Sequence, residues 1–155
     1  MFPGSTEEVS AVLQVCANHG VPVVPRGAGT GYSGGAVPRG GGVVVCLTRM
    51  NAVLGFEPEA MRIHVEAGMV TAAVHRRALD SGLYYPPDPG SSSTCTIGGN
   101  VACNSAGPHT LRYGTTGTRW FAHTWRTAET SSVEPGNTTA PGRCRSPDAP
   151  KASYP

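Results

Sequence analysis

The residues best suited to bind a ligand are the glycines of residues 26–35, which read Arg-Gly-Ala-Gly-Thr-Gly-Tyr-Ser-Gly-Gly. Glycine reaches positive φ angles and lets a backbone approach a ligand closely. Successive backbone N–H groups in such a loop can bind an anion without a lysine side chain. The stretch therefore predicts a binding loop for a diphosphate, and a flexible surface turn is the alternative for this composition.

The spacing Gly29-x-Gly31-x-x-Gly34 matches the dinucleotide fingerprint of Rossmann folds. That fingerprint binds a pyrophosphate only where a strand enters the loop and a helix leaves it. Here residues 36–42 are rich in glycine, and an apolar run at residues 43–47 follows them. No helix is expected there, so a Rossmann fold is disfavoured. A Walker A loop is excluded because no Gly-Lys-Ser/Thr sequence occurs.

A second stretch of small residues, 96–107, reads Thr-Ile-Gly-Gly-Asn-Val-Ala-Cys-Asn-Ser-Ala-Gly. The side-chain amides of Asn100 and Asn104 both donate and accept hydrogen bonds, which suits the rim of a flavin or adenine ring. Taken alone, this stretch is more simply a turn cluster rich in glycine and asparagine. Together, the two stretches predict an extended dinucleotide held between them.

Hydrophobic periodicity and turn residues predict an α+β fold around these loops. Ser5 and Glu8 have capping-box spacing at the start of a helix that Gly20 ends. The other expected elements are strands at residues 21–24 and 43–47, a hairpin at 53–57 and 62–66, a helix from residue 71 to Gly82, and a short strand at 83–85. The second helix is expected to turn His75, Arg76 and Arg77 toward solvent.

Bulk composition narrows the class of protein. The 155 residues suffice for one domain or part of one, and a net charge of +2 with 14% charged residues predicts no nucleic-acid partner. No apolar run approaches the roughly 20 residues of a transmembrane segment, and the N-terminus lacks signal-peptide features, so we expect a cytoplasmic protein.

The five cysteines form no CxxC pair and no zinc-ligand pattern, so we expect neither a disulfide framework nor a metal site. Cys16 and Cys46 occupy apolar positions of a predicted helix and strand, where cysteine fills the core. Cys95 and Cys103 are likewise expected to be small buried residues, and His64 to be an exposed strand residue.

Four separated motifs together carry a family resemblance: Pro-Arg-Gly-Ala-Gly-Thr-Gly at residues 25–31, Tyr-Pro-Pro-Asp-Pro-Gly-Ser at 85–91, Thr-Ile-Gly-Gly-Asn-Val-Ala-Cys-Asn at 96–104, and Leu-Arg-Tyr-Gly at 111–114. The chain resembles the FAD-binding domain of the vanillyl-alcohol oxidase type, the PCMH-type FAD domain. Within that superfamily it is most similar to the branch of the glycolate oxidase FAD subunit, D-lactate dehydrogenase and D-2-hydroxyglutarate dehydrogenase. The resemblance covers residues 3–117 in continuous order.

The resemblance implies how FAD would bind. The first loop would hold the pyrophosphate through main-chain N–H groups, with Arg26, Gly27, Ala28, Gly29, Thr30, Gly31, Ser33 and Gly34 as its binding residues. The flavin and ribityl side would be lined by Asp88, Ser91, Ser92, Ile97, Gly98, Asn100 and Asn104. Relatives that attach FAD covalently through the first loop use a histidine there. This loop has none, so we expect non-covalent FAD, with a thioether to Cys95 or Cys103 as the alternative.

The resemblance also implies an FAD-linked oxidation of a 2-hydroxy acid, in which a base takes the hydroxyl proton and the α-hydrogen passes as hydride to the flavin. In such relatives the groups that orient the substrate come from a C-terminal domain, so no catalytic residue is assigned here. A separate electron-acceptor subunit is a possible partner. The alternatives are an alditol or lactone oxidase of the same superfamily and a non-catalytic module that binds a nucleotide or a partner.

The resemblance ends near residue 118, and residues 119–155 contain a single Val, Ile or Leu residue, Val133. Such a segment buries too little apolar area to offset the entropy of ordering its backbone. We therefore expect a partial FAD domain at residues 1–118 and a low-order tail at 119–155. A natural disordered tail and a frameshifted end are the two explanations, and the second is preferred. A chain incomplete at both ends would show little or no catalysis.

Overall fold

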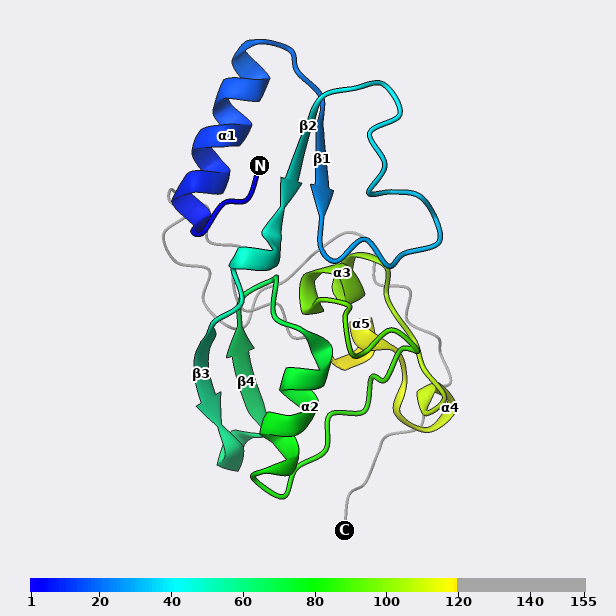
Figure 1. Cartoon of the computed structure of the whole chain (residues 1–155). Coiled ribbons are helices and arrows are strands. Elements are labelled where there is room, and N and C mark those ends of the chain that lie inside the picture. Colours follow the sequence, from blue (N-terminus) through cyan, green and yellow to red (C-terminus); the bar gives the residue numbers. More distant parts are fainter. Residues whose placement is uncertain (120–155) are drawn as a thin grey trace, which may run out of the picture. The chain divides into compact units, whose positions relative to one another are not determined.

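A computed structural model describes residues 1–119. In the described residues one α-helix precedes two small sheets, and the other α-helices follow both sheets (Figure 1). This arrangement confirms the α+β prediction. The frameshift hypothesis and Val133 fall outside the described residues, and the domain boundary after residue 118 stays a prediction.

The first sheet pairs β1 (Val23–Arg26) with β2 (Val43–Cys46) in parallel. β1 has the predicted length but lies two residues later than predicted, and β2 is one residue shorter because Leu47 begins a 3-10 helix, η1 (Leu47–Arg49). As expected, no helix separates the glycine-rich loop from β2. On the other side of β2, the amino group of Met1 donates to the Val44 carbonyl over 2.7 Å.

The first helix, α1 (Thr6–Asn18), begins and ends as its sequence predicts. The Glu8 N–H donates to Ser5 Oγ over 3.3 Å, and the Glu8 carboxylate accepts from the Gly4 N–H over 2.8 Å. These contacts use N–H groups that a helix start otherwise leaves unpaired. Beyond the helix, Gly20 has a φ of 64°, the left-handed conformation typical of a C-terminal stop.

The second sheet is the predicted antiparallel hairpin of β3 (Val53–Glu57) and β4 (Arg62–Val65). The turn is a 3-10 helix, η2 (Pro58–Ala60), closed by Met61 in the left-handed region with a φ of 50°. His64 lies exposed on β4, as predicted.

The second half of the described chain holds most of the corrections. After α2 (Thr71–Leu79), residues 83–85 form no strand, although their composition favours one. The second glycine-rich stretch was expected to be a loop, but it contains a helix, α3 (Ile97–Ala102). Two single-turn helices follow, α4 (Thr110–Tyr113) and α5 (Thr116–Arg119).

The buried core draws on both halves of the described chain, with Val45 from β2 and Val74 from α2 among its members. Cys16 and Cys46 are buried, which confirms their predicted core role. Gly68 lies where η1 meets the chain after β4, and a Cβ there would overlap the Leu47 carbonyl oxygen. Within residues 1–119, no helix has the length and apolar character needed to cross a membrane.

Candidate functional site

Residues 27–36 leave the end of β1 as the start of the long loop that leads to β2 (Figure 1). Gly29 and Gly34 have φ angles of 77° and 73°, which side chains rarely tolerate. Within residues 1–119, no backbone N–H from Gly27 to Ala36 donates a hydrogen bond to another protein group. A run of uncommitted N–H donors is what an anion-binding loop requires, so the loop fits a diphosphate.

Positive charge accompanies these donors. The Arg26 side chain lies against the loop, since a Cβ at Gly29 would be 3.0 Å from Arg26 Nε. At the end of β2, burial of Cys46 opposes ionisation, but hydrogen bonds with Thr48 and the charges of Arg26 and the amino terminus together lower the pKa of its thiol. The potential at the base of the loop therefore favours an anion.

The second predicted segment is fixed in place by backbone pairing with residues 67–72. The paired groups, each 2.8 to 3.0 Å apart, are Ile97 N with Met69 O, Gly98 N with Ala67 O, Thr71 N with Cys95 O, and Ala72 N with Ser92 O. The last two bonds satisfy N–H groups at the start of α2 that have no partner within the helix. Residues 92–98 are thereby attached to the start of α2 and to the chain just before it.

The structure brings the two predicted segments together at Gly27 and Thr96. A Cβ at Gly27 would overlap Thr96 Oγ1, so only glycine fits there without a shift. Thr96 Oγ1 also caps α3 by accepting from the Gly99 N–H over 3.3 Å. Further along the loop, a Cβ at Gly31 would be 3.9 Å from Cys103 Sγ. The prediction that these distant stretches lie side by side is confirmed.

The two asparagines have partners within the protein. Asn100 is 2% exposed, and its Nδ2 donates to Thr71 Oγ1 over 2.7 Å. Asn104 has a φ of 47°, and its Oδ1 accepts from the Gly117 N–H over 2.8 Å. Both side chains therefore help to hold α3 in place, whatever else they contact.

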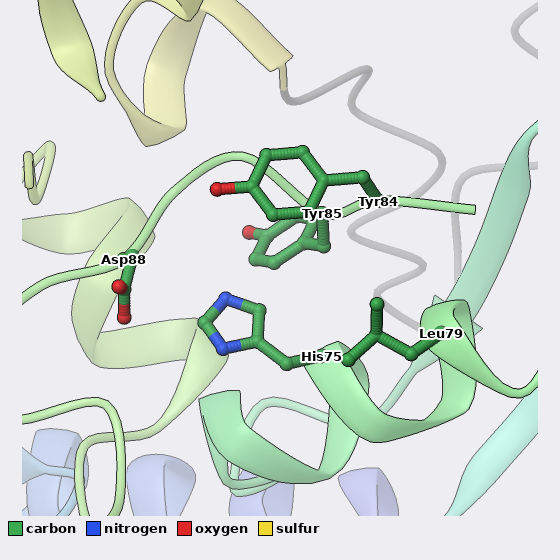
Figure 2. Close-up of a pocket in the computed structure, with 5 residues that line it drawn as sticks. All are labelled: His75, Leu79, Tyr84, Tyr85 and Asp88. Atoms are coloured by element: carbon green, nitrogen blue, oxygen red, sulfur yellow. The ribbon is translucent and has the colours of Figure 1, made fainter. Parts of the chain in front are cut away.

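Asp88 lines a pocket whose lining does not include Gly27 or Thr96. Figure 2 shows a pocket of about 120 Å³ lined by His75, Leu79, Tyr84, Tyr85 and Asp88. His75 Nε2 lies 2.8 Å from the Pro87 carbonyl oxygen, and its ring is 5.5 Å from that of Tyr85. Burial raises the pKa of the Tyr85 phenol. Arg76 and Arg77 are exposed as expected, but His75 is half-buried because the chain after α2 folds back across it.

Gly107 packs closely against the backbone of Asp88. A Cβ at Gly107 would overlap the Asp88 carbonyl oxygen, and the Gly107 N–H donates to Thr110 Oγ1 over 2.9 Å. Residues 107–110 therefore limit where the backbone at Asp88 can lie.

The predicted site residues thus fall into three groups. Residues Arg26, Gly27, Ala28, Gly29, Thr30, Gly31, Ser33 and Gly34 lie on the first loop or at its start, whereas Ser91, Ser92, Ile97, Gly98, Asn100 and Asn104 lie on or around α3, and Asp88 lies in the pocket of Figure 2. The first loop comes close to the chain around α3 at Gly27 and at Gly31, whereas nothing lies within 4 Å of a Cβ placed at Gly34. Contact of these residues with a cofactor remains a prediction.

Sequence reasoning missed two residues that organise the site, Thr71 and Thr96. Thr96 precedes Ile97, and a threonine at that point could have been recognised as a helix N-cap. Thr71 gave no sequence signal beyond the start of a helix. Cys103 was expected to be buried, but it is exposed, while Cys95 is buried as predicted.

Comparison with known proteins decides the family. A family profile described as an FAD binding domain matches residues 1–122. The chain belongs to this FAD binding domain family. The solved structure of an alkyldihydroxyacetonephosphate synthase has the same fold, with a TM-score of 0.65 and 28% identity over 74% of this chain and 24% of that one. The chain therefore has a PCMH-type FAD-binding fold.

Curated relatives of this FAD binding domain include hydroxy-acid enzymes. The glycolate oxidase subunit GlcD of Bacillus subtilis (strain 168) is 43% identical over 74% of this chain, and D-lactate dehydrogenase of Anaerostipes hadrus is 46% identical over 72%. D-2-hydroxyglutarate dehydrogenase of Xanthomonas citri is 45% identical over 78%. The matches cover 24%, 23% and 25% of those proteins, so the chain spans about a quarter of their length.

The contact between Gly27 and Thr96 predicts non-additive mutations. Gly27→Ala should destabilise the chain by about 2 kcal/mol because the new Cβ overlaps Thr96 Oγ1. Thr96→Ala should cost about 1 kcal/mol through loss of the helix cap. Because the alanine removes the clashing oxygen, the double variant should lose less than the sum of the two in urea unfolding.

Gly35→Ala is the matched control in the same loop, since nothing lies within 4 Å of a Cβ there. It should change stability by less than about 0.5 kcal/mol. Additive losses in the double variant would show that the two segments do not touch at Gly27.

Proposed function

We propose that this chain is the FAD-binding portion of an FAD-linked oxidoreductase that acts on the CH–OH group of a 2-hydroxy acid. One observation carries the proposal: the uncommitted N–H donors of residues 27–36 begin where Gly27 meets Thr96. Such donors suit the diphosphate of FAD. Membership of the FAD binding domain family supports FAD over other dinucleotides.

Two sets of residues would bind different parts of FAD. The first loop would bind the diphosphate through its N–H groups, beside the charge of Arg26. The flavin and ribityl groups would face the second set, Asp88, Ser91, Ser92, Ile97, Gly98, Asn100 and Asn104. When bound, FAD supplies the acceptor for the two electrons of the oxidation. The chain itself binds and orients that cofactor.

The substrate class follows from the names of the relatives. Glycolate, D-lactate and D-2-hydroxyglutarate all carry a hydroxyl group next to a carboxylate, and relatives named for all three match this chain. A 2-hydroxy acid is therefore the proposed substrate, with a separate electron-acceptor subunit as a possible partner. Because the chain spans about a quarter of those relatives, we propose that it binds FAD without oxidising the acid by itself.

Attachment of FAD is proposed to be non-covalent. The first loop contains no histidine, and Cys95 is buried with its Sγ 3.2 Å from Thr71 Oγ1. Cys103 is the exposed thiol beside Gly31. Acid precipitation should therefore release all flavin into the supernatant, and flavin that stays with the protein and is lost in Cys103→Ser would contradict this proposal.

A cytoplasmic location is part of the proposal. Cys16, Cys46, Cys95 and Cys103 are all free thiols, which is typical of proteins in a reducing compartment. Fractionation of cells that express the chain tests this, and recovery outside the cytoplasm would contradict it.

The diphosphate assignment predicts a difference between two flavins. The flavin fluorescence of FAD should decrease when the chain is added, and this change measures binding. Riboflavin, which lacks the diphosphate, should bind at least about tenfold more weakly, the equivalent of one lost charge-assisted hydrogen bond. Gly29→Ala should weaken FAD binding because Gly29 has a φ of 77°. Gly40→Ala, outside the proposed contacts, is the control. Equal affinity for FAD and riboflavin would show that the loop does not bind the diphosphate.

If this chain binds FAD and another part of the protein binds the acid, oxidation of the acid should occur only in a longer protein. The isolated chain loaded with FAD should reduce a dye with glycolate, D-lactate or D-2-hydroxyglutarate no faster than free FAD does. A chimera in which residues 1–117 replace the matching segment of the Anaerostipes hadrus D-lactate dehydrogenase should oxidise D-lactate. If the chimera binds FAD and remains inactive, a non-catalytic nucleotide-binding module is the better interpretation.

A further inference from the structure

A buried threonine holds one of the amides that the proposed function assigns to FAD. We infer that Thr71 is a positioning residue, which orients Asn100 so that its Oδ1 is available to a hydrogen-bond donor of the flavin or ribityl group. This inference rests on the proposed function. It adds Thr71, which lies outside the predicted site, and it states which end of the Asn100 amide would face the cofactor.

The hydrogen bonds of Thr71 determine whether the NH₂ group or the oxygen of the Asn100 amide faces Thr71. Thr71 is fully buried, and its Oγ1 accepts from Asn100 Nδ2 over 2.7 Å. The other neighbours of this hydroxyl belong to Cys95, whose carbonyl oxygen and Sγ lie 3.3 and 3.2 Å away. The hydroxyl donates its one proton to the Cys95 carbonyl oxygen, so toward Asn100 Nδ2 the oxygen acts as an acceptor. The NH₂ end of the amide must then face Thr71.

The opposite end of the amide is left open. Asn100 Oδ1 accepts no hydrogen bond from any group in residues 1–119. Every fully buried side-chain nitrogen or oxygen in the same part of the chain has a partner. Oδ1 must therefore reach the accessible surface, although Asn100 as a whole is only 2% exposed. An amide with one N–H bonded to Thr71 and an oxygen that accepts no hydrogen bond is suited to receive an O–H or N–H group.

The surroundings of Asn100 give this acceptor a fixed position. The Asn100 N–H donates to the Thr96 carbonyl over 2.9 Å, and Thr96 is the residue that meets Gly27 of the first loop. Thr71 is held in turn by the bond from its own N–H to the Cys95 carbonyl. Asn100 is thus connected through Thr96 to Gly27, at the start of the loop proposed to bind the diphosphate.

Thr71→Val and Thr71→Ser test the inference in the full 155-residue chain. Valine keeps the shape but loses the hydroxyl, so the amide can turn and the FAD dissociation constant should rise about tenfold. Serine keeps the hydroxyl, and its dissociation constant should stay within about twofold of the original. Urea unfolding without FAD separates this effect from a loss of stability, which serine and valine can each cause.

The side-chain NH₂ signals of Asn100 in NMR spectra of the unsubstituted chain provide a test that needs no variant. These protons should exchange slowly before FAD is added, and their resonances should shift when FAD binds. Unchanged resonances in FAD-bound protein, or a folded Thr71→Val variant with unchanged FAD affinity, would overturn this inference alone. A chain that binds no FAD at all would overturn the proposed function and the inference with it.

Discussion

The site depends on the backbone pairing between residues 67–72 and residues 92–98. Its hydrogen bonds place Thr96 at the base of the glycine loop, and each contributes about 1 kcal/mol in net terms. The pairing requires glycine where the chains are closest. A Cβ at Gly98 would lie 2.9 Å from the Ala67 carbonyl oxygen, closer than real side chains come. The glycine at position 98 is thus explained by chain packing before any ligand is considered.

The first loop has the opposite character. Its N–H groups from Gly27 to Ala36 have no partner in residues 1–119, and the loop is largely exposed. Water can satisfy exposed donors, so the free chain is not penalised for them. An anion that replaced this water would meet several donors together with the charge of Arg26. A rigid segment beside a donor-rich loop is an arrangement in which one segment orients a ligand and the other binds its charge.

Elements with local signals could be predicted from the sequence. The capping contact of Ser5, the stop at Gly20 and the hairpin turn all involve residues close together along the chain. α3 was missed because Gly98 and Gly99 each disfavour a helix by about 1 kcal/mol relative to alanine. The helix forms nonetheless because Thr96 caps it and residues 67–69 hold its start.

Long-range contacts account for the other errors. Residues 83–85 have the composition of a strand, but within residues 1–119 they pair with none, and Tyr85 packs on His75 instead. His75 was placed toward solvent because nothing in its own helix reveals that Pro87 returns to it. The nearness of the two glycine-rich stretches could be predicted because their compositions together suit one extended dinucleotide. Thr71 could not be found in this way, since its role depends on Asn100 across the fold.

The central claim is that two segments distant in sequence close on one FAD molecule. Hydrogen–deuterium exchange of the backbone amides, with and without FAD, measures both segments in one experiment. The account predicts that amides of residues 27–36 and of residues 91–104 become protected together, at the same FAD concentration, while those of α1 do not change. Protection of one segment without the other, or of neither at saturating FAD, would contradict it.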